Sequence, residues 1–172
     1  LGRKKIFGIK LNKLKKKPNR NNRLYNKELG GGAILDLGCY PVSFSILIAS
    51  LISKFDFIKT KVLNKKKEIG PTGVDMNSFA ELDFENNFRS TIGVSFTQNL
   101  GNKTKIIGTK GELILEDTWS PTNISSIQIN GENKKVIEIK CHNNIYSYEI
   151  DILSRCILEN KKEPDGSIKT EP

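Results

Sequence analysis

The spacing of hydrophobic residues along the 172-residue chain changes near residue 55. Before it, residues 33–54 are mostly apolar with small polar interruptions, which predicts one long helix. Pro41 lies inside this stretch and would leave the Leu37 carbonyl without its helical donor, so we expect a kink or a restart there. The alternative is a helix that begins only at Pro41, with Asp36 and Tyr40 in the preceding turn.

Residues 55–141 alternate between apolar and polar positions, which predicts a succession of strands. Asn86–Asn87 and Asn130–Gly131 are tight-turn signals that join two pairs of these strands into hairpins. Hairpin-linked strands favour an α+β fold with one large, mainly antiparallel open sheet and helices on one face. The expected strands are 6–11, 57–63, 77–85, 89–97, 103–107, 111–115, 124–129 and 135–141.

Residues 145–161 have the period of an amphipathic helix. Glu149 falls in the middle of its apolar face, so we expect this carboxylate to be buried and paired. Residues 1–32 form a basic arm with one strand, and 162–172 a polar tail, which makes 1–172 a single domain. The longest apolar run, residues 44–52, is too short to cross a bilayer.

The chain carries 28 basic and 19 acidic residues, and the excess lies at the N-terminus. Residues 1–27 hold 11 Lys or Arg and no acid, which leaves 17 basic against 19 acidic residues in the remainder. Such an arm can bind polyanions. Only Phe7 and Tyr25 could stack on bases there, and no nucleic-acid motif is present, so a solvated arm is favoured over a nucleic-acid site.

Several kinds of site are disfavoured by the motifs. Three cysteines without a C-x-x-C pair indicate reduced thiols and a cytoplasmic protein. His142 is the one histidine and no ligand spacing fits a metal, so we expect no metal site. Gly30 and Gly32 lack the third glycine and the preceding strand of a dinucleotide fold. The cysteines are Cys39, Cys141 and Cys156.

Asp36 and Tyr40 are the residues with the most suggestive chemistry. Their i, i+4 spacing places a carboxylate and a phenol on one face, about one turn apart, if the segment is helical. An acid near a helix N-terminus and a half-buried tyrosine would give the same pattern without any function. The two residues alone leave both readings open.

The wider string decides between them. Residues 23–41, RLYNKELGGGAILDLGCYP, resemble the glucose–fructose oxidoreductase/inositol dehydrogenase (GFO/IDH/MocA) family. In that family a loop R-L-x-N/D-P-x-L precedes G-G-G-A-L-x-D-x-G-x-Y/H, and Lys27 stands here where the loop usually has proline. The resemblance continues through residues 72–75, 107–111 and the last helix. A tyrosine at position 40 points to the branch similar to dihydrodiol and aldose dehydrogenases.

The resemblance implies the C-terminal, dihydrodipicolinate-reductase-like domain of an NAD(P)-dependent oxidoreductase that acts on a sugar, polyol or related CH–OH substrate. The family's N-terminal Rossmann domain and the lysine of its Glu-Lys-Pro sequence are absent from these residues, so we expect a fragment that is inactive alone. Tyr40 would exchange the substrate proton with help from that lysine. Asp36 would orient substrate hydroxyls or the lysine, and Arg23 and Asn26 would line the pocket.

The resemblance also implies a homodimer, or a higher oligomer, that pairs through the open sheet face. Two other functions compete with the oxidoreductase. One is a non-catalytic dimeric sheet scaffold. The other is a polyanion-binding protein that uses residues 1–27, whose affinity would fall steeply with salt.

Overall fold

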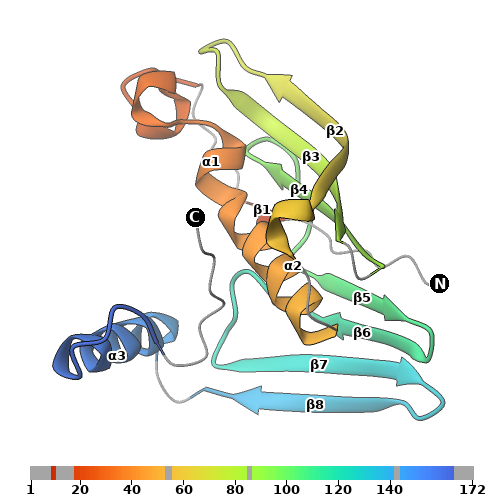
Figure 1. Ribbon diagram of the computed structural model, residues 1–172. Coiled ribbons are helices and arrows are strands. Elements are labelled where there is room, and N and C mark those ends of the chain that lie inside the picture. The colour runs from red at the N-terminus through yellow and green to blue at the C-terminus, as the bar shows by residue number, and fades with distance from the viewer. Residues whose placement is uncertain (1–8, 11–17, 53–55, 85–86, 142–143, 165–172) are drawn as a thin grey trace.

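The computed structural model describes residues 9–10, 18–52, 56–84, 87–141 and 144–164. Their strands form two four-stranded sheets. Figure 1 shows the sheets one above the other, with two successive helices running down past both and a third helix standing apart. The α+β class with antiparallel open sheets is therefore confirmed. The predicted single sheet is divided in two.

The first sheet has the strand order β1-β4-β3-β2. Its antiparallel members are the two hairpin strands and a long edge strand, and the short β1 pairs parallel to β4. Bounds are β1 (Ile9–Lys10), β2 (Lys61–Ile69), β3 (Asp75–Phe84) and β4 (Phe88–Ser95). The predicted strand at 6–11 can be judged only at Ile9–Lys10, because its other residues lie outside the described ones.

The second sheet is antiparallel throughout, in the order β5-β6-β7-β8. Its strands are β5 (Thr104–Gly108), β6 (Gly111–Leu115), β7 (Ile124–Gly131) and β8 (Lys135–Lys140). The chain leaves the first sheet after Ser95, whose Oγ accepts the backbone N–H groups of Thr97 and Gln98 at 3.0 and 2.6 Å. This side-chain bonding replaces the strand ladder and ends β4, which separates the two sheets.

The strand predicted at 57–63 begins later than expected. Phe57–Lys59 is a short 3₁₀ turn, η3, whose first N–H groups are capped by Asp56, with the Ile58 N–H donating to Asp56 Oδ1 at 3.0 Å. β2 then runs to Ile69 and is exposed at every position. An edge strand with both faces in solvent shows no alternation, so its second half could not be seen in the sequence pattern.

The predicted long helix is present and broken near Pro41. It consists of α1 (Ala33–Leu37) and α2 (Cys39–Ile52), with a bend of 42° between the helical segments on either side of Gly38. The Gly38 N–H donates to the Ile34 carbonyl at 2.8 Å and the Val42 N–H to the Gly38 carbonyl at 3.1 Å. Since Pro41 has no N–H for the Leu37 carbonyl, the break falls where proline removes that bond.

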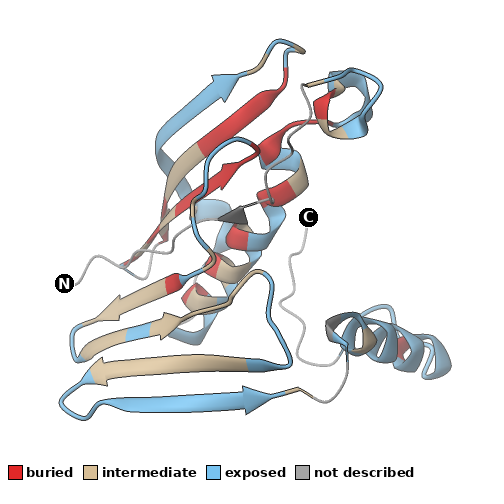
Figure 2. Cartoon of the chain, turned by 180° about the vertical axis from the view of Figure 1, so that it is seen from behind, coloured by how far each residue is buried: buried red, intermediate tan, exposed pale blue. Residues whose placement is uncertain are grey.

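Both buried clusters lie around the first sheet and these two helices. α2 presents Pro41, Ser45 and Ala49, one turn apart, to the core. The Ser45 hydroxyl donates to the Pro41 carbonyl at 2.6 Å and lies 2.7 Å from Ser90 Oγ of β4, so its polar atom is satisfied. Figure 2 shows the buried residues concentrated on β3, β4 and this helix.

The last helix, α3 (Ile145–Leu158), ends three residues earlier than predicted, and Asn160 follows with a left-handed φ of 54°. The prediction for Glu149 is wrong: this residue is exposed. Cys156 is the one buried side chain among those described in α3. Figure 1 shows α3 lying away from both sheets, so none of the other described elements covers its apolar face, and the Glu149 carboxylate stays exposed.

No single helix in the described ranges is long and apolar enough to cross a membrane. The bent pair Lys27–Leu37 and Cys39–Ile52 reaches that length and composition only when taken together.

Candidate active site

The glycine triplet is built into a tight junction before α1. Two short 3₁₀ turns, η1 (Arg23–Tyr25) and η2 (Lys27–Leu29), precede it. A Cβ on Gly31 would lie 2.6 Å from the Arg23 carbonyl oxygen and 2.7 Å from that of Asn26, which no side chain could do without moving the backbone. Gly32 has a φ of 123°, and a Cβ there would overlap Asp75 Oδ1. The motif therefore folds the loop tightly against α1.

This junction brings two of the predicted site residues into contact. Arg23 Nη2 donates to Asp36 Oδ1 in an ion pair between η1 and α1. The Arg23 side chain is 56% exposed and that of Asp36 17% exposed, so the pair lies at the surface with the guanidinium outward. An arginine that uses one N–H in this way keeps further donors for a bound hydroxyl or carbonyl.

Asn26 lies on the same loop, and its side chain makes hydrogen bonds to backbone groups of that loop. Its Oδ1 accepts from the Glu28 N–H at 3.0 Å, and its Nδ2 donates to the Arg20 carbonyl at 3.1 Å. These bonds fix the junction between η1 and η2. A contact of Asn26 with substrate stays a prediction.

Tyr40 lies in the first turn of α2 and is 58% exposed. The break at Gly38 lies between Tyr40 and Asp36, so the two residues belong to different helices, α2 and α1. Nothing in the structure tests their catalytic roles, which stay predictions. The exposure of Tyr40 leaves its phenol open to a ligand or to another domain.

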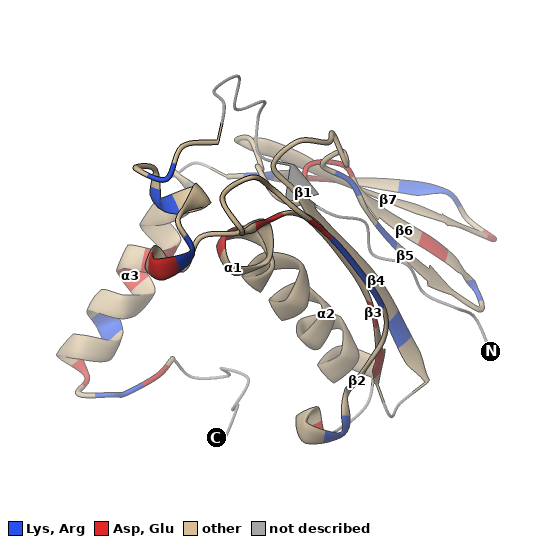
Figure 3. Cartoon of the chain, turned by 90° about the horizontal axis from the view of Figure 1, so that it is seen from above, with Lys and Arg blue, Asp and Glu red and all other residues tan. Residues whose placement is uncertain are grey.

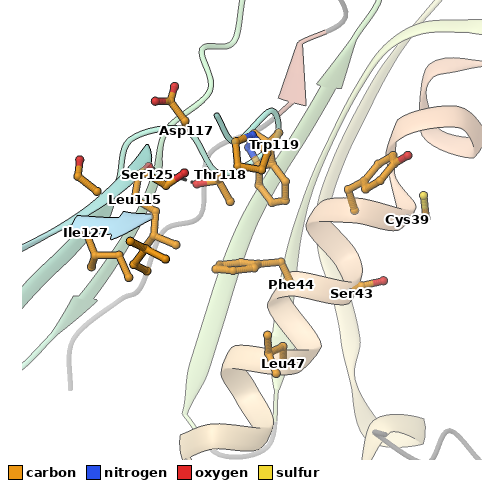
Figure 4. Close-up of a pocket in the computed structure, with 14 residues that line it drawn as sticks. Cys39, Ser43, Phe44, Leu47, Leu115, Asp117, Thr118, Trp119, Ser125 and Ile127 are labelled. Atoms are coloured by element: carbon orange, nitrogen blue, oxygen red, sulfur yellow. Dashed lines mark hydrogen bonds between the residues drawn. The ribbon is translucent and has the colours of Figure 1, made fainter. Parts of the chain in front are cut away.

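A groove of about 750 Å³ begins at Tyr40 and runs between α2 and the second sheet. Figure 4 shows Phe44 and Leu47 extending from the helix toward Leu115 and Ile127 of the sheet. The Phe44 and Trp119 rings meet edge to face, with centroids 5.7 Å apart. The lining side chains, all from the described part of the chain, include no Lys or Arg.

The sequence prediction missed this groove. Trp119, the chain's single tryptophan, lies in an irregular segment after β6 and packs against both buried clusters. Its backbone N–H donates to Asn102 Oδ1 at 2.9 Å. A lone tryptophan outside any predicted element was the signal that could have directed attention to this segment.

Tyr25 anchors the loop beneath the ion pair. It is buried, and its ring meets Phe96 edge to face at 5.7 Å. Burial raises the pKa of Tyr25 above its ordinary value, because the charged phenolate would lose its hydration. Within the described ranges, no group of three His, Cys, Asp or Glu side chains is placed to hold a metal ion.

Comparison with known proteins gives the class of the molecule. Residues 5–114 match the GFO/IDH/MocA C-terminal domain, and the chain belongs to this family. It is 31% identical over 165 residues to trans-1,2-dihydrobenzene-1,2-diol dehydrogenase of Xenopus tropicalis, covering 91% of this chain and 45% of that protein.

Solved structures share the fold. A 3-ketoreductase from Actinomadura kijaniata, in complex with NADP and TDP-benzene, superposes with a TM-score of 0.77 at 16% identity, over 96% of this chain and 49% of its own. An aldose-aldose oxidoreductase from Caulobacter crescentus complexed with glycerol gives 0.62 at 16% identity, over 94% and 46%. The chain therefore spans about half the length of the relatives it matches.

Proposed function

We propose that this chain is the substrate-binding and dimerisation half of an NAD(P)-dependent oxidoreductase acting on a sugar, polyol or related CH–OH compound. The observation that carries the proposal is the exposed Tyr40, which borders an apolar groove at the start of α2, just after the short helix α1 whose Asp36 forms a surface ion pair with Arg23. A hydroxylated ring presents polar edges and an apolar body. The polar side chains can make hydrogen bonds to the hydroxyl groups, and the apolar groove can contact the carbon skeleton.

The described residues contain no strand, glycine loop and helix that could hold a dinucleotide, so a nicotinamide would be held by another domain. When bound, that group supplies or takes the hydride. Tyr40 gives or takes the proton of the substrate hydroxyl at its phenolic oxygen. Arg23 and Asp36 orient the neighbouring hydroxyls, and the groove excludes water from the carbon skeleton.

Replacing Tyr40 by phenylalanine tests this function. In the enzyme that joins this chain to a nucleotide-binding domain, Tyr40→Phe should lower kcat by roughly 10²-fold or more, the scale of a positioned acid or base, with cofactor affinity nearly unchanged. Asp36→Asn should cost less and act mainly on KM. Tyr146→Phe, at a tyrosine on α3 that is 62% exposed, is the matched control. A Tyr40→Phe enzyme as fast as wild type would contradict the proposal.

The 172-residue chain alone gives a second test. We expect no turnover of NAD(P) by it, and measured turnover would refute the division of labour proposed here. Because Trp119 is its one tryptophan and borders the groove, its fluorescence reports whether a candidate alcohol enters. A ligand of the groove should shift this emission without any cofactor.

The proposed dimer rests on apolar side chains left open on the edge strands. Val62 and Ile69 of β2 and Val136 of β8 are 57%, 55% and 62% exposed. Light scattering at tens of micromolar should give the mass of a dimer. A monomer would contradict both this pairing and the scaffold hypothesis. The scaffold and the enzyme are then separated by the Tyr40→Phe assay.

The remaining predictions concern the basic arm and the compartment. Most of residues 1–17 lie outside the described ones, so polyanion binding through the arm stays a prediction, tested by salt-dependent retention on heparin. A cytoplasmic location is part of the proposal. It is supported by Cys39, Cys141 and Cys156, which are free thiols.

A further inference from the structure

Two motifs that are distant in the sequence meet at the start of α1. Asp75, the first residue of β3, accepts the Ile34 backbone N–H on its Oδ2 at 2.9 Å. The Ser78 hydroxyl donates to the same oxygen at 2.6 Å. The other oxygen, Oδ1, lies against Gly32, where any side chain would displace it.

This carboxylate replaces a missing helix cap. The N-cap position of α1 is Gly32, which has no side chain to accept the first free N–H groups of the helix. Asp75 supplies that acceptor from the neighbouring sheet, at a site where it is only 9% exposed. Its negative charge also suits the positive end of the helix. Burying a carboxylate is costly unless it accepts hydrogen bonds. The two bonds from Ile34 and Ser78 offset this cost only in the orientation that the Asp75 side chain adopts here.

The geometry points to Asp75 as a positioning residue for the proposed reaction. α1 is five residues long, so its direction is fixed by what holds its ends. Asp75 ties the first turn to β3, and two residues beyond the tethered Ile34 the same helix carries Asp36, the partner of Arg23. Asp75 thus acts through α1 on the ion pair, without touching substrate. This inference rests on the proposed function.

The test compares two aspartates of the same strand in the complete oxidoreductase. Asp75→Asn removes the charged acceptor under α1, whereas Asp83→Asn breaks a different contact, the ion pair of Asp83 with Arg89 at the far end of β3. We expect Asp75→Asn to lower kcat/KM about tenfold, since a small displacement of a positioning group costs up to about 10²-fold. Asp83→Asn should stay within about twofold of wild type.

A double-mutant cycle distinguishes a positioning role of Asp75, which acts through Asp36, from a role in stability alone. If Asp75 acts through Asp36, Asp75→Asn should cost less than about twofold in an Asp36→Asn background, because the positioned group is already gone. A full tenfold loss in both backgrounds would overturn the inference, as would a fall in Tm with unchanged kcat/KM. Should Asp75→Asn not fold, Ser78→Ala removes only one donor, and its loss of about two- to threefold should vanish in the same background.

The Tyr40→Phe and Asp75→Asn assays together distinguish a failure of this inference from a failure of the proposed function. A damaged Tyr40→Phe enzyme together with a normal Asp75→Asn enzyme overturns the positioning role and leaves the oxidoreductase standing. A normal Tyr40→Phe enzyme overturns the oxidoreductase itself. In this chain, the amide resonance of Ile34 should move in Asp75→Asn and stay in place in Asp83→Asn, which checks the tether without any activity.

Discussion

The two sheets of this molecule differ sharply in how they are packed. The inner strands β3 and β4 of the first sheet are largely buried, whereas the inner strands β6 and β7 of the second are mostly half-buried. The edge strands β2 and β8 are exposed in both sheets. Apart from Cys156, the buried hydrophobic residues of the described chain all lie between Tyr25 and Phe96. The Arg23–Asp36 pair and Tyr40 therefore stand on the well-packed half, and the far wall of the groove belongs to the open half.

The difference follows from what covers each sheet. α2 contains no charged residue, and it packs its buried stripe onto the first sheet. In Figure 3 the ribbon of this helix has no acidic or basic residue along it, whereas the strands of the sheet beside it carry both. The second sheet has salt bridges on its surface, such as Lys105 with Glu112, and α3 does not cover it. In the proposed oxidoreductase, Tyr40 would therefore stand on the packed half and face the less buried second sheet across the groove.

The largest expected effect comes from removing the same two methyl groups in each half. Val94 of β4 is 1% exposed and Val136 of β8 is 62% exposed. Val94→Ala should lower the free energy of unfolding by about 2–3 kcal/mol, through lost burial and a residual cavity. Val136→Ala should change it by less than about 0.5 kcal/mol. Urea denaturation of both variants measures this, and equal losses would erase the distinction between the halves.

Alkaline pH should weaken the packed half through Tyr25. Since burial raises the pKa of Tyr25 in the folded state, its contribution to stability is complete below the ordinary value near 10 and is lost as pH rises through the higher folded value. Tyr25→Phe should therefore reduce the loss of stability above pH 10. Denaturation series at pH 7 and at about pH 11 provide the comparison. An identical alkaline loss in the variant would show that Tyr25 is not the group responsible.

Local patterns in the sequence predicted the elements well where one face is buried. The hairpin of β3 and β4 lies where its turn signal placed it, because alternation and turn residues act over a few positions. The hairpin of β7 and β8 also forms, but its turn is not at Asn130–Gly131: these two residues end β7 and pair with β6, and the chain turns at 132–134. The break in the long helix was predicted for the same reason, from one proline. The family resemblance added the fold class, which the comparisons confirm.

Contacts between distant segments could not be predicted in this way. The bond from Ile34 to Asp75 spans 41 residues, and no local period marks it. The split of the sheet depends on Ser95 turning the next two N–H groups away from the ladder. The periodicity of residues 145–161 correctly indicated a helix. It could not indicate whether another element covers the apolar face of that helix.

A smaller effect tests the correction at α3. Because Glu149 is exposed, Glu149→Ala should change the free energy of unfolding by less than about 0.5 kcal/mol, as surface substitutions usually do. The loss expected for a buried carboxylate would be several times larger. Thermal unfolding measures the stability lost in this variant and in Val94→Ala. The comparison shows whether Glu149 contributes to stability as a buried core residue does or as an exposed residue does. A cost near that of Val94→Ala would mean that α3 packs against the rest of the chain.

The smallest effect concerns the surface charges of the open sheet. Hydrogen bonds from Lys105 and then Asn130 lower the pKa of Glu112 below its ordinary value, with Lys105 Nζ 2.5 Å and Asn130 Nδ2 3.1 Å from the carboxylate. A lowered folded pKa gives stability that is present above the unfolded value and is lost as pH falls through the folded one. Lys105→Met should raise the pKa of Glu112 toward its ordinary range, which carboxyl-carbon NMR titration measures. The unfolding free energy at pH 7 should barely change, because solvent screens an exposed pair. A large loss at neutral pH would show that the second sheet depends on its charge pairs as the first depends on its core.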